Sequence, residues 1–389
     1  IIGRNSSGKS LLLRLMWALS TAEPKYDLLV NDLERLLSSH NLKELWKDRG
    51  RRLTAKDKKE IEEYIVIYAK AFFSSLLIDA WKKVSEVLGP AKGEVVLSSD
   101  NLRVTVSLNG DKPELKPEPK ELLSIEVSDE QVPKVSLKAF DLHDSDYVES
   151  VSDLNEFTHI TLLYFMYSSF VPFFQFKDYV YFLVDSRAGL MRYKSSSLMK
   201  VRDISDSITK GFIDSYFTLL EEYQRGKVSV PKEFFDELGF RVKVVDEGGF
   251  KVPYVQLWND QVFHLSEAPS GVREALPIAL ALNSKEGSVV YIEEPEAHLH
   301  PRAQRVVARM IADAAKRGNY VIITTHSDYL LYTLSNIIGK YRKDRKAGLD
   351  PNMVSVYLLK RGDKYTEVEK LTVDEYGISE EEFSKVIDE

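Results

Sequence analysis

The stretch GRNSSGKS at residues 3–10 decides the fold, because it matches the pattern G-x-x-x-x-G-K-[S/T]. Gly3 and Gly8 allow backbone conformations that turn consecutive N–H groups toward one anion. The helical pattern KSLLLRLMWALS at 9–20 follows at once, and the positive end of that helix faces the same anion. Lys9 is placed to reach the terminal phosphates of a nucleotide, and the Ser10 hydroxyl to bind Mg²⁺. The loop predicts ATP or GTP binding through Gly3, Asn5, Ser6, Ser7, Gly8, Lys9 and Ser10.

Two further stretches, VVYIEE at 289–294 and YVIITTHS at 320–327, are continuous apolar runs that end in polar residues. Such runs are typical of central parallel strands that are covered on both faces. The helical pattern between them begins at Pro301, so the three segments predict a strand–helix–strand unit. The apolar side chains Val306, Met310 and Ala314 share one face of this helix.

The polar residues at the ends of these two strands could supply the Mg²⁺ contact, the general base and the γ-phosphate contact that a phosphate loop does not itself provide. Glu293 is expected to hold Mg²⁺ through water, and Glu294 to polarise the attacking water as a general base. Aspartate is usual at the first of these positions, and Glu293 is one methylene longer. His326 is a candidate for hydrogen bonding to the γ-phosphate at the end of the second strand.

The segment LSEAPSGVREALPIALAL at 265–282 predicts a second helix whose N-terminus faces an anion. Ser270 is expected to be its N-cap, and Gly271 allows a close backbone approach. A single nucleotide site does not require this second helix end.

Composition limits the classes of protein further. The chain has no cysteine and no apolar run of about 18 residues, so disulfides, cysteine-ligated metals and membrane spans are not expected. A reducing, cytoplasmic location fits this composition. The net charge of −7 provides no general attraction to nucleic acid, although basic runs occur at 47–59 and 340–348. The chain opens on Ile1 rather than Met, so we expect residues upstream, including most of the first strand.

The sequence predicts one α/β domain over residues 1–389, with a mixed central sheet, an antiparallel β subdomain and a helical lobe. The antiparallel part includes a hairpin signal at Asn109-Gly110 and a connector rich in proline and charge at 112–121, and another hairpin is expected around Gly248-Gly249. The expected regions are a helical insertion at 26–92, an antiparallel β part at 93–142, a helical lobe at 150–240 and the remaining core at 241–389.

Together these stretches resemble the ABC class of P-loop ATPases, within its SMC/RecF/OLD-like branch. GRNSSGKS resembles the Walker A motif, APSGVRE the signature, VVYIEEPEAHLHP the Walker B motif with its D-loop, and IITTHS the histidine switch. The segment YFLVDSRAGLMR at 181–192 is similar to one in OLD-type ATPases that leads toward the nucleotide, which makes Arg187 a candidate contact. The signature lacks the second glycine of the transporter version. The resemblance implies that two ATPase heads enclose two ATP molecules, with Ser270 and Gly271 acting on the nucleotide bound by the opposite head.

Three functions remain open at this point. The first is an ATP-hydrolysing head that dimerises on ATP and acts on DNA, in repair or mobile-element defence, with a partner effector. No acidic nuclease pattern follows His326, so nuclease activity is not expected within this chain. The second is a nucleotide-gated interaction module with slow turnover and no nucleic acid. The third treats Glu296, His298 and His300 as a transition-metal site, whereas the ABC-like interpretation places them in the D-loop, in contact with the opposite head.

Overall fold

The computed structural model of the chain divides into two compact units, which are described separately. One comprises Ile1–Trp17 with Lys177–Glu389, and the other Ala18–Phe176. The structure describes residues 1–3, 7–22, 79–80, 82–83, 179–363 and 365–378, together with the backbone of strands at 92–98, 102–109, 112–119, 125–127 and 135–137. The helices predicted within 26–92 lie outside the described residues except at 79–80 and 82–83, which are helical, and so do those predicted at about 150–170.

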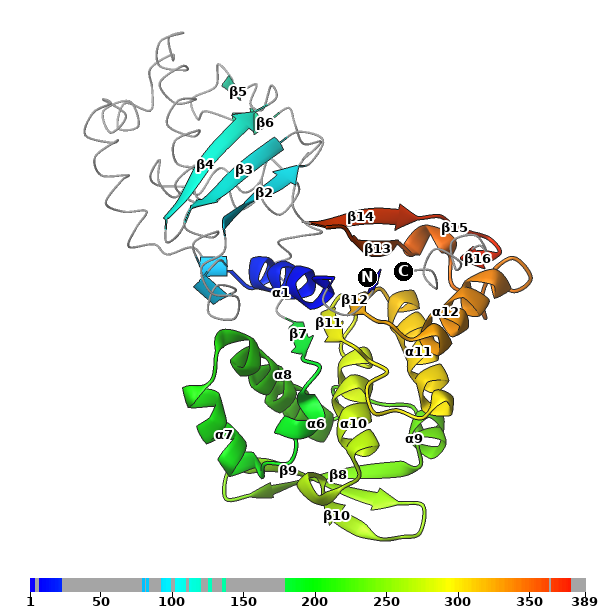
Figure 1. The fold of residues 1–389 in the computed structure, drawn as a ribbon. Coiled ribbons are helices and arrows are strands. Elements are labelled where there is room, and N and C mark those ends of the chain that lie inside the picture. Colours follow the sequence, from blue (N-terminus) through cyan, green and yellow to red (C-terminus); the bar gives the residue numbers. More distant parts are fainter. Residues whose placement is uncertain are drawn as a thin grey trace. The chain divides into compact units, whose positions relative to one another are not determined.

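The first unit is built on a mixed sheet (Figure 1). Its strands are β1 (Ile2–Gly3), β7 (Val180–Leu183), β11 (Val289–Glu293), β12 (Tyr320–Thr324), β13 (Val356–Arg361) and β14 (Thr366–Leu371). β12, β11 and β7 form a parallel sheet in that order, which confirms that the two apolar runs are neighbouring parallel strands. β1 pairs in parallel with β13, and Ile2 bridges Thr325 at the end of β12. The strand that enters the glycine loop therefore lies between β13 and β12.

The helix α1 (Lys9–Ser20) packs on one face of this sheet. The rings of Trp17 and Phe182 lie 5.0 Å apart, and the Tyr291 hydroxyl donates to the Met16 carbonyl at 3.4 Å. Phe182 and Tyr291 are register partners on β7 and β11, so both project from the same face. Because side chains alternate along a strand, Glu293 projects from this α1 face as well.

The unit contains further α-helices. They are α6 (Arg187–Leu190), α7 (Ser195–Ile204), α8 (Ser207–Gln224), α9 (Lys232–Leu238), α10 (Ser270–Leu282), α11 (Pro301–Lys316) and α12 (Asp328–Lys340). α11 begins at Pro301 as predicted, and Val306, Met310 and Ala314 are all buried. Among the described residues, none of the helices is long and apolar enough to cross a membrane.

α8 protects the outer edge of the sheet. Asp206 caps it by accepting from the N–H groups of Ile208 and Thr209. The Ser215 hydroxyl oxygen on α8 accepts from the Phe182 N–H of β7 at 3.1 Å, so a backbone donor on the edge strand is satisfied.

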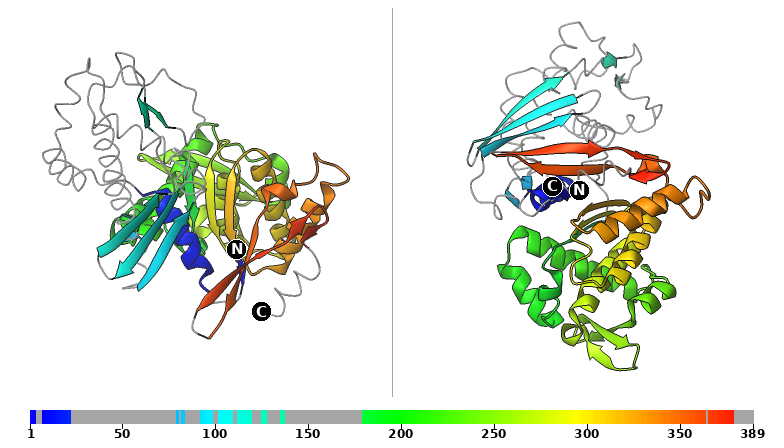
Figure 2. Two further views of the ribbon diagram at one scale, coloured as in Figure 1. Left: turned by 90° about the horizontal axis from the view of Figure 1, so that it is seen from above. Right: turned by 45° about the vertical axis from the view of Figure 1, so that its right-hand side comes forward.

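A small antiparallel sheet leads into α10. It contains β8 (Phe240–Glu247), β9 (Phe250–Leu257) and β10 (Val262–His264). Glu247 pairs with Phe250, which confirms the predicted hairpin around Gly248-Gly249. A short 3₁₀ helix, η2 (Leu265–Glu267), then connects β10 to α10. Figure 2 shows the small sheet in yellow-green.

The second unit contains the predicted antiparallel strands. β2 (Lys92–Ser98), β3 (Leu102–Asn109) and β4 (Lys112–Pro119) form one sheet, and β5 (Ile125–Val127) pairs with β6 (Val135–Leu137). Asn109 pairs with Lys112, so Asn109 belongs to β3 itself, although the sequence suggested a turn at Asn109-Gly110.

The connector predicted at 112–121 is wrong over most of its length, because β4 is an edge strand there. Its prolines at 113, 117 and 119 are spaced by even numbers of residues. Since alternate residues direct their N–H groups to the same side of a strand, all three missing donors can lie on the side away from β3.

Candidate nucleotide site

The glycine loop between β1 and α1 has the backbone conformations that the sequence predicts. Gly3 and Gly8 have φ angles of +143° and +89°, which side-chain-bearing residues rarely adopt. A Cβ atom on Gly3 would lie 2.5 Å from the Leu359 carbonyl oxygen of β13. Of the seven predicted loop residues, Asn5 and Ser6 lie outside the described residues.

Lys9 joins the two ends of this loop by a hydrogen bond. Its ammonium donates to the Gly3 carbonyl at 2.8 Å, and the side chain is buried. Burial lowers the pKa of Lys9, and the nearby carboxylates Glu294 and Glu296 oppose that shift. Ser7 is buried with no hydrogen-bond partner for its hydroxyl among the described residues, whereas Ser10 is partly exposed at the start of α1.

Glu294 and His326 meet where β11 and β12 end. The Glu294 Oε1 atom lies 3.4 Å from His326 Nδ1. Glu294 has a φ of +44°, and its N–H donates to the Thr324 carbonyl at 2.9 Å. Because β1 lies beside β12, the Lys9 loop follows β1 at the same end of the sheet at which β11 and β12 end. The strand order therefore brings Lys9, Glu294 and His326 together.

Glu296 holds the segment that carries His326, a role that the sequence did not reveal. Its Oε1 atom accepts from the Thr325 hydroxyl at 2.7 Å and from the His326 N–H at 3.0 Å. Its Oε2 atom is buried without a partner among the described residues. The side chain is thus buried inside this chain, whereas the sequence suggested that it contacts an opposite head.

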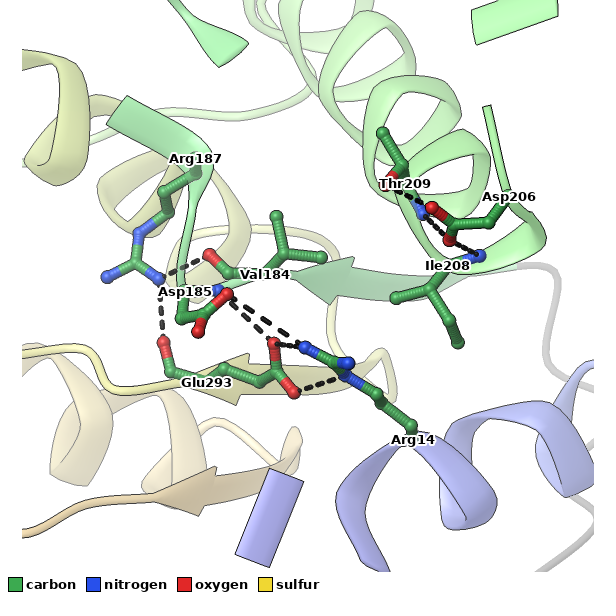
Figure 3. A network of polar contacts seen from close by, with 8 residues as sticks. All are labelled: Arg14, Val184, Asp185, Arg187, Asp206, Ile208, Thr209 and Glu293. Atoms are coloured by element: carbon green, nitrogen blue, oxygen red, sulfur yellow. Dashed lines mark hydrogen bonds and ion pairs between the residues drawn. The ribbon is translucent and has the colours of Figure 1, made fainter. Parts of the chain in front are cut away.

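Glu293 forms a buried ion pair with Arg14 (Figure 3). Arg14 donates from Nε to Oε1 at 2.7 Å and from Nη2 to Oε2 at 2.9 Å, and the Asp185 N–H donates to Oε2 at 3.2 Å. Burial raises the pKa of Glu293, and the bonds from Arg14 pull it back. Arg14 lies one helical turn after Ser10 on α1, and this spacing was the only sequence signal for it.

This pairing bears on the predicted Mg²⁺ ligands, Ser10 and Glu293. The Ser10 residue is accessible, but both carboxylate oxygens of Glu293 already accept from Arg14. The donor set therefore fits Mg²⁺ in part, because the buried Glu293 carboxylate shares its oxygens with Arg14.

Arg187 lies in the core, although the sequence suggested a contact to nucleotide. Its guanidinium is fully buried and donates from Nη1 to the carbonyls of Val184 at 2.7 Å and Glu293 at 2.6 Å, and from Nη2 to that of Glu294 at 2.8 Å. Its Nε lies 2.6 Å from a carboxylate oxygen of Glu274 on α10. Burial lowers the pKa of Arg187 and raises that of Glu274.

The two signature-like residues lie at the start of α10, where Ser270 is exposed and Gly271 is partly exposed. The helix begins at Ser270, and its N-cap is Pro269, so the prediction that Ser270 is the N-cap is wrong. Pro269 is extended, with a ψ of 151°, and takes the N-cap position, so the helix starts one residue earlier than expected. Ser270 is exposed, and a Cβ atom on Gly271 would lie 3.3 Å from the His298 carbonyl oxygen, in keeping with the predicted close approach.

The transition-metal interpretation of Glu296, His298 and His300 is wrong. His298 Nδ1 lies 3.1 Å from Glu274, and His300 Nδ1 accepts from the Arg302 N–H and caps α11. Glu296 faces Thr325 instead. The described part of the chain holds no cluster of three histidine, cysteine or acidic residues suited to a metal ion.

Comparison with known families gives one match. Residues 190–331 match a family described as an AAA ATPase domain. This stretch includes α10, β11 and β12, and it ends within α12. No curated protein matches the sequence.

Comparison with solved structures finds SMC heads. The chain is similar to an SMC head bound to the C-winged helix domain of ScpA, at 12% identity and a TM-score of 0.42, over 96% of this chain and 90% of that one. It is similar to the SMC head domain from Thermotoga maritima at 11% identity and a TM-score of 0.32, over 72% and 73% of the two chains. A structure from work on ATP-driven dimerization and DNA stimulated activation of SMC ATPases gives 17% identity and a TM-score of 0.31, over 45% of this chain and 94% of that one. At these identities and TM-scores the likenesses are too remote to identify a function.

Proposed function

We propose that this chain, whose fold is that of an ABC-type P-loop ATPase, binds ATP at the Lys9 loop and hydrolyses it to ADP and phosphate. The observation that carries the proposal is the 3.4 Å approach of Glu294 to His326 at the ends of β11 and β12, of which β12 lies beside β1, the strand that enters the Lys9 loop. The family match to an ATPase domain includes both of these strands.

Each residue has a distinct task in the proposed reaction. The N–H groups of the loop and the ammonium of Lys9 bind the phosphates, and Lys9 offsets the charge that develops on the γ-phosphate. Glu294 accepts the proton of the attacking water. His326 hydrogen-bonds the γ-phosphate, and its neighbour Glu294 favours the orientation of the imidazole. Mg²⁺, held by Ser10 and the phosphates, supplies further charge neutralisation when it is bound.

Two ATPase heads are proposed to enclose the nucleotide, as in the SMC/RecF/OLD-like branch. The exposed start of α10 at Ser270 and Gly271 would contact the γ-phosphate bound by a second copy of the chain. An OLD-like role on DNA, in repair or mobile-element defence with a partner effector, is the biological setting that this resemblance favours.

Phosphate release by the wild type and the Glu294→Gln variant tests the catalytic assignment. Because the amide cannot accept a proton, we expect the variant to bind ATP normally and to hydrolyse it about 100-fold more slowly. Glu286→Gln is the matched control, because Glu286 is an exposed glutamate in the turn before the same strand. Equal rates in the wild type and Glu294→Gln would remove Glu294 from the reaction.

A nucleotide-gated interaction module with slow turnover is the second candidate, and the Arg14–Glu293 pair favours it. A carboxylate whose two oxygens already accept hydrogen bonds from an arginine is a poorer partner for Mg²⁺, and weaker Mg²⁺ binding would slow hydrolysis. Gel shifts with duplex and single-stranded DNA over a salt series, with and without ATP, separate the two. Absence of binding at low salt would favour the interaction module.

A further inference from the structure

We infer that Arg187 and Glu274 form a positioning link that joins the start of α10 to the backbone of Glu294. The inference rests on the proposed function, and it assigns a task to two buried residues that do not touch the nucleotide. They are positioning residues, because they act through Glu294.

The Arg187 half of the link holds the end of β11. Its two terminal nitrogens donate to the carbonyls of Glu293 and Glu294 at 2.6 and 2.8 Å, and Figure 3 shows the guanidinium turned toward this strand end. A guanidinium presents its donors in a rigid plane, so these bonds set the orientation of consecutive peptide groups.

The backbone of Glu294 depends on that support. Its φ of +44° lies in a region that residues with side chains rarely adopt, and such a conformation persists only where the surroundings determine it. Here Thr324 holds the N–H of Glu294, and Arg187 holds its carbonyl. The direction in which the Glu294 carboxylate leaves the strand, toward His326, is therefore set in part by Arg187.

The Glu274 half of the link reaches the signature-like residues. Glu274 lies one helical turn after Ser270 on α10, is fully buried, and contacts Arg187 Nε at 2.6 Å. Its other oxygen lies 3.1 Å from His298 Nδ1, and the His298 carbonyl lies against Gly271. An ion pair and a hydrogen bond thus join Glu274 on α10, through Arg187, to the Glu294 carbonyl.

Such a link transmits a displacement of α10 to the general base. When a phosphate of a second copy engages Ser270, a shift of α10 moves Glu274 and Arg187, and so changes the orientation of Glu294. Hydrolysis then follows engagement of both heads, while ATP binding at the Lys9 loop does not require the link. Networks of ion pairs and hydrogen bonds of this kind are physical carriers of coupling between sites.

Arg187→Lys tests the link, because lysine keeps the charge and loses the planar donors. We expect kcat to fall about 10- to 100-fold, since small displacements of a reacting group have effects of that size. ATP affinity and ATP-driven dimerisation are expected to stay close to wild type. Arg202→Lys is the matched control, because Arg202 also makes two bonds to one partner, Asp214, and joins α7 to α8. We expect it to lower stability without changing kcat.

Glu274→Gln provides the second, milder variant, because the amide oxygen can still face Arg187. We expect a smaller loss of kcat, and a double variant whose loss is less than the product of the two single losses. Three outcomes would overturn the link. The first is a double variant whose loss of kcat equals the product of the two single losses, and the second is an unchanged kcat in Arg187→Lys. The third is a parallel fall of kcat, ATP affinity and melting temperature in both single variants. A wild type that hydrolyses no ATP would overturn the proposed function and the link with it, whereas a normal wild type beside unchanged variants would overturn the link alone.

Discussion

At the scale of single residues, burial and pairing give two adjacent glutamates different tasks. Glu293 follows the alternation of β11 onto the α1 face and pairs with Arg14, while the positive φ of Glu294 turns its side chain toward His326. The sequence predicted that both carboxylates lie at a strand end beside the Lys9 loop. It could not predict the partners, because Arg14 is separated from Glu293 by 279 positions and Arg187 from Glu294 by 107. Contacts between such distant positions leave no periodic signal in one sequence.

The Arg14–Glu293 pair yields a stability prediction. Arg14→Met leaves the fully buried Glu293 carboxylate without its partner, and we expect a loss of roughly 3 kcal/mol in the free energy of unfolding. The double variant Arg14→Met/Glu293→Met removes both charges and is expected to lose less than Arg14→Met alone. Urea unfolding of the three proteins measures this, and a double variant less stable than Arg14→Met would contradict it.

At the scale of elements, short-range patterns predicted most helices and strands of the first unit. The helix at 9–20, the two apolar strands and the Gly248-Gly249 hairpin depend on neighbouring residues, which a sequence displays directly. The errors arose where backbone chemistry outweighed a residue preference. Pro269 displaced Ser270 from the N-cap, and the even spacing of three prolines let 112–119 become an edge strand.

The short connection between β10 and α10 yields a pH prediction. His264 Nδ1 accepts from the Ser266 N–H at 3.1 Å, a bond that requires an unprotonated nitrogen. Burial, and then the charge of Lys194, lower the pKa of His264 below its ordinary value of 6.5. The folded state thus favours neutral His264, and this contribution is complete above pH 6.5 and is lost as the pH falls through the lowered pKa.

His264→Asn tests this assignment, because asparagine can cap the turn and does not titrate in this range. Between about pH 8 and about pH 5, we expect the wild type to lose more stability than the variant. Urea unfolding at the two pH values measures the difference, and parallel losses in the two proteins would rule out His264 as the titrating cap.

At the scale of the whole molecule, the strand order explains why residues from 9, 294 and 326 form one site. β12 lies between β11 and the short β1, so three strand ends meet at one edge. The exposed start of α10 at Ser270 does not belong to this cluster, and a single nucleotide site gives it no phosphate to bind. The proposal that a second copy supplies that ligand follows from the resemblance to ABC-type heads, and it calls for a test of association.

Self-association provides that test. We expect Glu294→Gln to accumulate as an ATP-dependent dimer, because it binds ATP and rarely hydrolyses it. Adding Ser270→Arg should abolish the dimer and leave ATP affinity of the monomer unchanged, since a bulky side chain at the start of α10 blocks the opposite phosphate. Sedimentation with and without ATP measures both proteins, and a dimer that persists with Ser270→Arg would place the contact elsewhere.

Single-turnover hydrolysis, with enzyme in excess over ATP, tests most directly the claim that Glu294 is the general base of an ATPase site. This measurement separates binding from chemistry, which steady-state rates combine. We expect wild type and Glu294→Gln to capture ATP equally, the wild type to convert it to ADP and phosphate, and Glu294→Gln to retain it as ATP. Conversion at the same rate in both proteins, or ATP that neither protein converts, would contradict the account.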